Sequence, residues 1–137
     1  MSHHLDLGCG NTPRNPYKQD QIYGVDINYS CIDKVNFKKA NLFLEKIPYE
    51  TNYFDSVSAY DFIEHIPRII ITPNEGSVRY SFIEVMYEIW RVLKPGGFLF
   101  ASTPFYPNSD AFVDPTHVNF ITAKTHQYFC GNSPLAK

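Results

Sequence analysis

The sequence predicts an α/β fold built on a mainly parallel, doubly wound sheet. Short apolar segments, each long enough for one strand, recur along the chain and are separated by polar crossovers or by one clear helix. That alternation is typical of parallel strands, because a parallel pair needs a crossover between its members. A glycine-rich turn ends the first segment, as at the ligand-binding edge of such sheets. The 137 residues, 44% of them hydrophobic, suffice for a core of their own, so residues 1–137 are expected to form a single domain.

Five strands are expected, at residues 4–7, 22–27, 35–37, 54–60 and 98–101. The third depends on Val35 and Phe37, which alternate with polar neighbours. The fifth, FLFA, is apolar throughout and is therefore expected to be covered on both faces.

One long helix is expected between the fourth and fifth strands. Apolar residues recur there with helical spacing at Phe82, Val85, Met86, Ile89, Trp90 and Leu93. Trp90 and Met86 are expected in the core. Ser81 and Glu84 have the spacing of a capping box, and the run KPGG at 94–97 is expected to end the helix.

The remaining segments are expected to be mostly irregular. Residues 13–21 are polar and interrupted by prolines, so they offer at most a short helix. Residues 67–76 hold two prolines and a glycine, which indicates a loop. A further short helix is expected within residues 122–129.

Charge and composition exclude several classes of protein. The net charge of −2 gives no basic excess, which argues against a protein that binds nucleic-acid backbone. No apolar run approaches the length of a membrane span, and the first residues lack the features of a signal peptide, so a cytoplasmic location is expected. Cys9, Cys31 and Cys130 are odd in number and widely spaced, which suits reduced thiols. No Cys/His spacing matches a zinc site, so no metal is expected.

The turn after the first strand is the first candidate binding site. Asp6 lies inside an apolar run, and Gly8 and Gly10 follow it one residue apart. A buried acid needs a partner, and glycines in this arrangement allow backbone to come close to a ligand. Ligands of open parallel sheets bind at the carboxyl ends of the strands, which here are the segments after Leu7, Ile27 and Tyr60.

Two classes of cofactor are candidates for this turn. A dinucleotide fingerprint needs a third glycine where Pro13 stands, and Asp6 would face a pyrophosphate unfavourably. S-adenosylmethionine carries a sulfonium and an ammonium and no phosphate, so an acid beside the turn suits it. Asp26 lies 18 residues after Gly8, close to the spacing of about 20 at which an acid binds ribose hydroxyls. The alternative for Asp26 is an acid that caps a loop.

Four segments together resemble the class I S-adenosylmethionine-dependent methyltransferases, over roughly residues 4–104. They are LDLGCGNTP (5–13), YGVDI (23–27), NYFDSVSAYDFIEHI (52–66) and EIWRVLKPGGFLFASTP (88–104). A fifth segment, DPTHVNFIT (114–122), resembles one found in a bacterial subgroup of these enzymes.

The resemblance implies a sheet of order 3-2-1-4-5-7-6 with helices on both faces. The chain ends where strands six and seven would follow, so the expected order is 3-2-1-4-5 with those two strands missing or truncated. Strand five would then be an exposed apolar edge, which is an association hazard. Either the chain is a fragment, or a partner chain or a second copy covers that edge.

The resemblance also implies the cofactor site. Asp6, Gly8 and Gly10 would surround the methionine part, and Asp26 would bind the ribose. Asn41 and Leu42 would lie near the adenine, with asparagine in place of the commoner aspartate. The expected cofactor-binding set is Asp6, Gly8, Cys9, Gly10, Asp26, Ile27, Asn41, Leu42, Tyr60 and Asp61. For Cys9, a small residue lining a tight turn is favoured over a nucleophile.

Methyl transfer would be an in-line displacement that leaves S-adenosylhomocysteine, assisted by a base if the acceptor is a hydroxyl. The candidate bases are His117 and His65, and Asp114 is placed to orient His117. For each histidine the alternative is a hydrogen-bonded residue that pins a loop. No D/N-P-P-[YFW] tetrapeptide follows strand four, so the expected acceptor is a small molecule, saccharide or lipid and not DNA.

Two other functions compete with this hypothesis. A non-catalytic or partner-dependent subunit of the same fold is suggested by the short termini and opposed by the intact acids and glycines. Nicotinamide-dependent reduction is opposed by Pro13.

Overall fold

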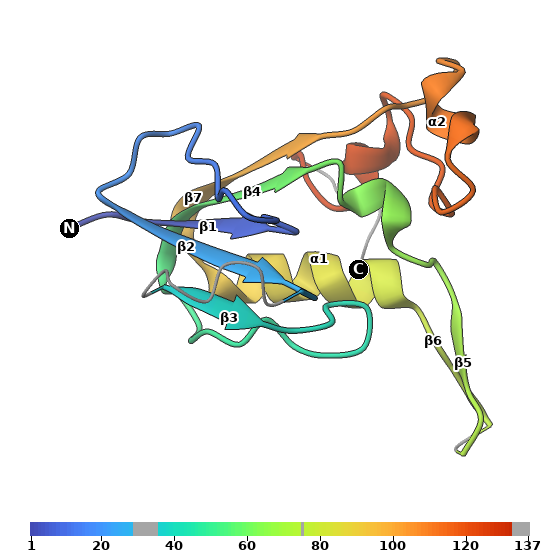
Figure 1. Ribbon diagram of the computed structural model, residues 1–137, viewed down its shortest axis with the longest axis horizontal. Coiled ribbons are helices and arrows are strands. Elements are labelled where there is room, and N and C mark those ends of the chain that lie inside the picture. Colours follow the sequence, from blue (N-terminus) through green and yellow to red (C-terminus); the bar gives the residue numbers. More distant parts are fainter. Residues whose placement is uncertain (29–35, 75, 133–137) are drawn as a thin grey trace.

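A computed structural model of the protein describes residues 1–28, 36–74 and 76–132 (Figure 1). Val35 of the expected third strand and Cys31 lie outside the described residues. The elements in chain order are β1 (His3–Leu7), β2 (Gln21–Asp26), β3 (Phe37–Lys39), β4 (Phe54–Tyr60), the 3-10 helix η1 (Ile63–His65), β5 (Ile70–Thr72), β6 (Ser77–Arg79), α1 (Ser81–Val92), β7 (Leu93–Ser102), α2 (Asp110–Val113) and the 3-10 helix η2 (Thr125–Tyr128).

The main sheet has five parallel strands in the order β3-β2-β1-β4-β7. This confirms the α/β class and the expected order 3-2-1-4-5, since β7 is the fifth strand of that prediction. Because every strand runs in the same direction, the carboxyl ends of β1, β2 and β4 meet at one edge of the sheet (Figure 1).

The two faces of the central strands differ in polarity. Leu5 and Leu7 of β1 are fully buried in the apolar core, whose other wall is α1 with Phe82 and Ile89 (Figure 1). Successive strand residues point to opposite faces, so His4 and Asp6, which alternate with the leucines, lie on the other side of the sheet. One of them, His4, is also fully buried. A buried polar layer therefore lies opposite the apolar core.

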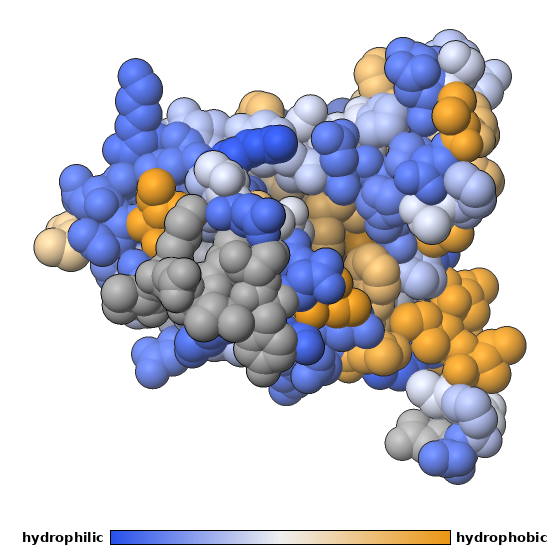
Figure 2. Space-filling model, in the orientation of Figure 1, coloured by the Kyte–Doolittle hydropathy of each residue, from blue (hydrophilic) through white to orange (hydrophobic). Residues whose placement is uncertain are grey.

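The segment expected to be a loop contains a hairpin instead. β5 and β6 pair antiparallel, with Ile71 opposite Val78. The hairpin extends away from the sheet, and apolar side chains gather near its base (Figures 1 and 2). Ile71 is 72% exposed, so the hairpin is not part of the core. Pro73 and Gly76 mark its turn, which is why this region has the composition of a loop.

The start of α1 corrects the predicted capping box. Ser81 donates its hydroxyl to the carbonyl of Phe43 at 2.9 Å, which ties the helix to the segment after β3. Glu84 pairs with Arg79 at 2.7 Å. The N-cap residue is Tyr80, which makes no side-chain cap hydrogen bond. Both side chains of the expected box are therefore used in tertiary contacts.

β7 is longer and more exposed than predicted. The helix ends at Val92, and β7 begins at once, so the run KPGG at 94–97 lies within the strand. Leu99 packs against the core, whereas its neighbour Phe98, on the opposite face of the strand, is 60% exposed. The expectation that both faces of this strand are covered was therefore wrong. Trp90, expected in the core, is 70% exposed on the outer side of α1, while Met86 packs against the core as predicted.

The other irregular segments largely follow the prediction. Residues 13–21 form turns and no helix before β2 begins. The short helix expected within 122–129 is the 3-10 helix η2. Over residues 1–28, 36–74 and 76–132, no helix has the length and apolar character needed to cross a bilayer.

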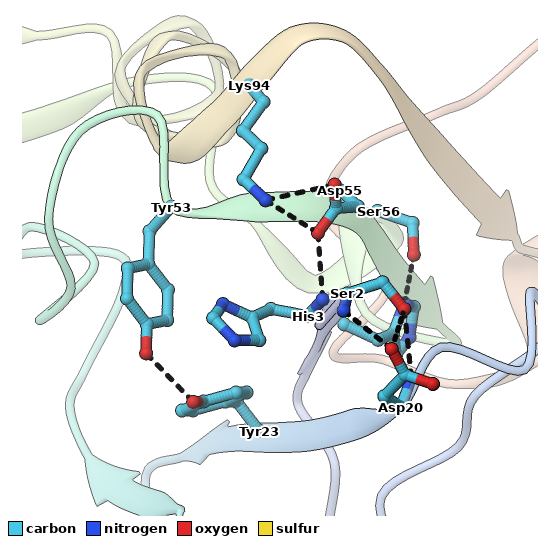
Figure 3. A network of polar contacts seen from close by, with 9 residues as sticks. Ser2, His3, Asp20, Tyr23, Tyr53, Asp55, Ser56 and Lys94 are labelled. Atoms are coloured by element: carbon cyan, nitrogen blue, oxygen red, sulfur yellow. Dashed lines mark hydrogen bonds and ion pairs between the residues drawn. The ribbon is translucent and has the colours of Figure 1, made fainter.

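The amino ends of the strands are held by paired side chains (Figure 3). The hydroxyls of Tyr23 and Tyr53 lie 2.8 Å apart, and the ring of His3 stacks on Tyr53 at 4.6 Å. Asp55 accepts hydrogen bonds from the backbone of His3 and from Lys94, both at 2.8 Å. These contacts fix the edge opposite the carboxyl ends of the strands.

Candidate functional site

The turn after β1 contains the two predicted glycines, both in the left-handed region. Gly8 has φ +61° and Gly10 has φ +53°. A Cβ on Gly8 would lie 2.7 Å from Cδ2 of Phe62, whereas a Cβ on Gly10 would meet nothing within 4 Å. Gly8 is therefore required by packing and by conformation. Gly10 is required by conformation alone and faces open space, as a turn that meets a ligand would.

Cys9, between the glycines, has a structural role. Its thiol is buried against β2, where a Cβ on Gly24 would lie 2.7 Å from the sulfur. Its backbone N–H donates to the carbonyl of Val25 at 3.2 Å. The interpretation as a small residue lining a tight turn is thus supported over a nucleophile.

Asp6 belongs to the buried polar layer and is satisfied within the protein. Its carboxylate accepts hydrogen bonds from the hydroxyl of Ser58 at 2.5 Å and from the backbone of Arg14 at 2.8 Å. His4 extends this layer, with Ser56 2.7 Å from its Nδ1 and Ser58 2.8 Å from its Nε2. Burial raises the pKa of Asp6 and lowers that of His4 to about 4. The acid in the apolar run therefore joins β1 to β4 and to the segment after the turn.

Asp26 connects the end of β2 to the glycine turn. One carboxylate oxygen accepts from the backbone N–H of Gly10 at 2.9 Å, and the other accepts from Asn28 at 2.9 Å. The next residue, Ile27, is 52% exposed. Asp26 thus contacts the glycine turn and makes the local contacts of a capping acid, and its binding of ribose stays a prediction.

Asn41 and Leu42, which follow β3, lie in different environments. Asn41 accepts from the backbone of Phe43 at 3.2 Å, and its own N–H donates to Glu45 at 2.6 Å. It therefore stabilises a local turn. Leu42 is 5% exposed and belongs to the apolar core.

Tyr60 and Asp61 lie at the carboxyl end of β4. The guanidinium of Arg14 lies 4.3 Å above the Tyr60 ring, which brings the segment after the glycine turn over β4. Asp61 has φ +47°, which is uncommon for a residue with a side chain. Its N–H donates to the carbonyl of Ser102 at 2.8 Å, so its exposed side chain is held at the edge of the sheet.

The fold brings the two candidate bases together. The rings of His65 and His117 meet edge to face with centroids 4.8 Å apart. Nδ1 of His65 lies 3.1 Å from the carbonyl and 3.0 Å from the hydroxyl of Thr116. Nδ1 of His117 lies 3.3 Å from the carbonyl of Ala111. Each histidine is thus pinned to a loop through one nitrogen.

Asp114 does not orient His117 through a hydrogen bond. Its carboxylate lies 3.8 Å from Nε2 of His117, beyond hydrogen-bond distance. It accepts instead from the hydroxyl of Thr116 at 2.7 Å and from its N–H at 2.8 Å. These hydrogen bonds hold the pKa of the Asp114 carboxyl below its usual range.

Residues 114–122 are clamped onto η1 by an asparagine that sequence reasoning missed. Asn119 is 2% exposed, donates to the carbonyl of Ile63 at 2.9 Å and accepts from Arg68 at 2.6 Å. The backbone N–H groups of Val118 and Asn119 both donate to the carbonyl of Glu64, at 3.0 and 2.9 Å. The DPTHVNFIT segment was the available signal, and its physical role is to place His117 beside His65.

Glu64 was also missed. Its side chain is 2% exposed, and neither carboxylate oxygen has a hydrogen-bond partner among the described residues. The available signal was an acid within the otherwise largely apolar stretch FIEHI. A buried carboxylate without a partner is costly, which makes this position unusual.

A family model described as a methyltransferase domain matches residues 5–101. No significant match was found among curated protein sequences. A SAM-dependent methyltransferase from Archaeoglobus fulgidus has the same fold, with 20% identity, a TM-score of 0.65, and coverage of 93% of this chain and 58% of that one. The (4+2)-cyclase SpnF follows, with 22% identity, a TM-score of 0.62, and coverage of 90% and 46%.

A third similar structure comes from the complex between the Haloferax volcanii Trm112 methyltransferase activator and a protein described as a methyltransferase. It shows 16% identity, a TM-score of 0.53, and coverage of 76% of this chain and 46% of that one. This chain therefore spans about half the length of the solved structures that it resembles.

Proposed function

Because the chain belongs to the class I S-adenosylmethionine-dependent methyltransferase family, we propose that it binds S-adenosylmethionine at the carboxyl edge of its sheet and transfers the methyl group to a small-molecule acceptor. The observation that carries this proposal is the hydrogen bond between Asp26 and the backbone of Gly10. It joins the acid at the end of β2 to an open turn after β1, which is where a nucleoside lies in folds of this type.

The charges at this edge suit a cationic cofactor without phosphate. Asp26 contacts the turn, and the exposed Asp61 follows the carboxyl end of β4, where a nearby cation is the Arg14 guanidinium over the ring of the last residue of that strand. A pyrophosphate would be repelled by these carboxylates, whereas a sulfonium and an ammonium would be attracted. Asp26 would hold the ribose hydroxyls, and the backbone around Gly8 and Gly10 would hold the methionine part.

S-adenosylmethionine supplies an electrophilic methyl group in such a reaction and leaves as S-adenosylhomocysteine. The role of the protein is to align the acceptor with the methyl group and to remove the acceptor's proton. His65 follows the end of β4 and donates its N–H to the carbonyl of Phe62, which contacts the glycine turn, and His117 lies beside His65. In the neutral form, Nε2 of either ring would accept the acceptor's proton.

The acceptor that we propose is a small molecule, saccharide or lipid headgroup. The net charge of −2 offers no general attraction to a nucleic acid. After β4 the chain reads Tyr60-Asp61-Phe62-Ile63, which lacks the proline pair of DNA amino-methylating enzymes.

The test is titration calorimetry with S-adenosylmethionine and S-adenosylhomocysteine. We expect saturable binding in the micromolar range, weakened at least tenfold by Asp26→Ala. The matched control is Asp20→Ala, which removes an acid just before the other end of β2 and should leave binding unchanged. Absence of binding to the folded wild-type chain would contradict the proposal, and an unchanged affinity of Asp26→Ala would remove the ribose assignment.

A partner-dependent subunit is the second candidate. β7 pairs with β4 on one side and with no described strand on the other, so a protein surface is available for a partner. One structure of similar fold was solved with a methyltransferase activator, and another protein of this fold is a cyclase. Formation of S-adenosylhomocysteine must therefore be measured directly. Cofactor binding without turnover by the isolated chain would favour this second candidate.

A further inference from the structure

Three side chains with metal-binding atoms meet where residues 114–122 pack on η1. One atom each from Glu64, His65 and His117 lies within 4.8 Å of the other two. Two ligand atoms of one tetrahedral zinc ion lie about 3.3 Å apart, because each bond is about 2.0–2.1 Å. Small side-chain rotations would therefore bring the three atoms to binding distance.

The hydrogen bonds of the histidines leave the correct nitrogen free on each ring. The partner of Nδ1 in His117 is a carbonyl, which can only accept, so Nδ1 carries the hydrogen. The carbonyl of Thr116 gives the same result for His65. In neutral imidazoles the Nε2 lone pairs are then unprotonated. Metal-binding histidines usually have this arrangement, with the second ring nitrogen donating to a carbonyl or carboxylate.

Glu64 provides the negative charge. Its carboxylate is 2% exposed and has no hydrogen-bond donor among the described residues. Buried charges in proteins are normally paired or bound to metal. The side chain of His117 is 11% exposed, so the cluster is largely shielded from water on that side as well.

We propose that Glu64, His65 and His117 form a binding site for a divalent first-row transition metal ion. Two imidazoles and one carboxylate favour zinc, iron, cobalt or manganese over magnesium and calcium, which prefer oxygen ligands. Three protein ligands leave a position open for water or for an oxygen atom of a bound molecule, as in catalytic zinc sites. Asp114, 3.8 Å from Nε2 of His117, is a further oxygen close to the site.

This inference is independent of methyl transfer, since it depends only on the three side chains. It does change the expected roles of the histidines. A bound ion would occupy both Nε2 lone pairs, so His65 and His117 could act as bases only in the metal-free protein.

The first experiment is a titration of the metal-free full chain with Co²⁺, followed by displacement with Zn²⁺. We expect one equivalent to bind, with visible d–d absorption and no thiolate charge-transfer band, because the cluster contains no cysteine. Glu64→Gln, His65→Gln and His117→Gln should each weaken binding at least tenfold, since loss of even an outer-shell partner typically costs about 10–100-fold.

The matched control is His126→Gln, which removes an exposed histidine of η2 and should leave the metal affinity unchanged. Circular dichroism of each variant identifies any loss of fold, and the wild-type titration shows whether the chain binds one equivalent at all. Failure to bind one equivalent of Co²⁺ or Zn²⁺ up to millimolar concentration would overturn the proposal. So would a thiolate band, or an affinity unchanged in all three ligand variants.

A parallel titration with S-adenosylmethionine in excess chelator separates the two proposals. Cofactor binding without metal binding would overturn only the metal site. Metal binding without cofactor binding would leave the metal site standing and contradict the proposed function.

Discussion

At the scale of single residues, His4 makes the stability of the fold depend on pH. It is fully buried between Ser56 and Ser58, and burial lowers its pKa from 6.5 to about 4. In the unfolded chain the imidazole takes up a proton near pH 6.5. Between pH 6.5 and 4 the unfolded state therefore binds more protons, and the free energy of unfolding falls as the pH is lowered. The loss amounts to as much as about 3 kcal/mol, at about 1.4 kcal/mol per pKa unit.

Urea unfolding at several pH values between 7 and 4 measures this loss. His4→Gln should be less stable at neutral pH. Its free energy of unfolding should also fall less steeply than that of the wild type as the pH is lowered. The difference between the two proteins isolates His4 from Asp6, whose pKa is shifted the opposite way. His126→Gln, at an exposed site, should retain the slope. Equal slopes in wild type and His4→Gln would contradict the buried neutral imidazole.

The two glycines of the turn provide a matched pair. Alanine at either position adopts a left-handed conformation, at roughly 1–2 kcal/mol. Gly8→Ala also places a Cβ 2.7 Å from Phe62, and overpacking adds roughly 1–3 kcal/mol. Denaturant unfolding should therefore rank Gly8→Ala below Gly10→Ala in stability. If Gly10→Ala were the less stable protein, the packing assigned to Phe62 would be wrong.

Sequence reasoning could single out residues that lie close together in the chain or that follow a regular spacing. The glycine turn and Asp26 were found because their spacing follows from adjacent parallel strands. Glu64 and Asn119 were not found, because their environment depends on a contact between segments more than 50 residues apart. Asp6 was correctly expected to need a partner, but Ser58 became visible as that partner only with the register of β1 and β4.

At the scale of elements, Arg91 fastens the segment after β3 to α1. Its guanidinium pairs with Glu88 at 2.6 Å and donates to the carbonyls of Ile47 and Tyr49 at 2.9 and 3.0 Å. Glu88 is 8% exposed and also accepts from the backbone of Ile47. Arg91→Ala would leave a largely buried carboxylate without its cation, so we expect a loss of about 2–3 kcal/mol.

The control for Arg91→Ala is Lys94→Ala. Lys94 pairs with Asp55 at the exposed edge shown in Figure 3, where the two side chains are 37% and 31% exposed. Such pairs contribute at most about 1 kcal/mol. Equilibrium unfolding in urea compares the two variants. Equal losses would mean that Arg91 acts as an ordinary surface cation.

Elements were predictable where a periodic pattern coincided with burial. The strand at 54–60 and the helix from 81 have the expected limits because their apolar residues face the core. The hairpin β5–β6 was missed, since its apolar residues are exposed and its turn residues indicate a loop. The burial of β7 was predicted wrongly, because four apolar residues in a row do not reveal which of them lie on the face of the strand away from the core. Phe98 and Phe100 lie on that face, at 60% and 37% exposure.

At the scale of the whole molecule, the free edge of β7 predicts association of the 137-residue chain. No strand within residues 1–28, 36–74 and 76–132 pairs with β7 on the side away from β4, and Phe98 of this strand is exposed. Sedimentation velocity should therefore show concentration-dependent self-association of the wild-type chain. Phe98→Lys should reduce it, because a charge on an edge strand opposes strand addition. The contact of Phe98 with Tyr17 is peripheral, so the variant should remain folded.

The hairpin is the competing surface, and Ile71→Lys tests it. Ile71 is 72% exposed and belongs to the separate β5–β6 hairpin, opposite Val78. If the edge drives association, Ile71→Lys behaves as wild type while Phe98→Lys becomes monomeric. The reverse result would assign the interface to the hairpin. A wild-type chain that stays monomeric at high micromolar concentration would contradict the predicted association.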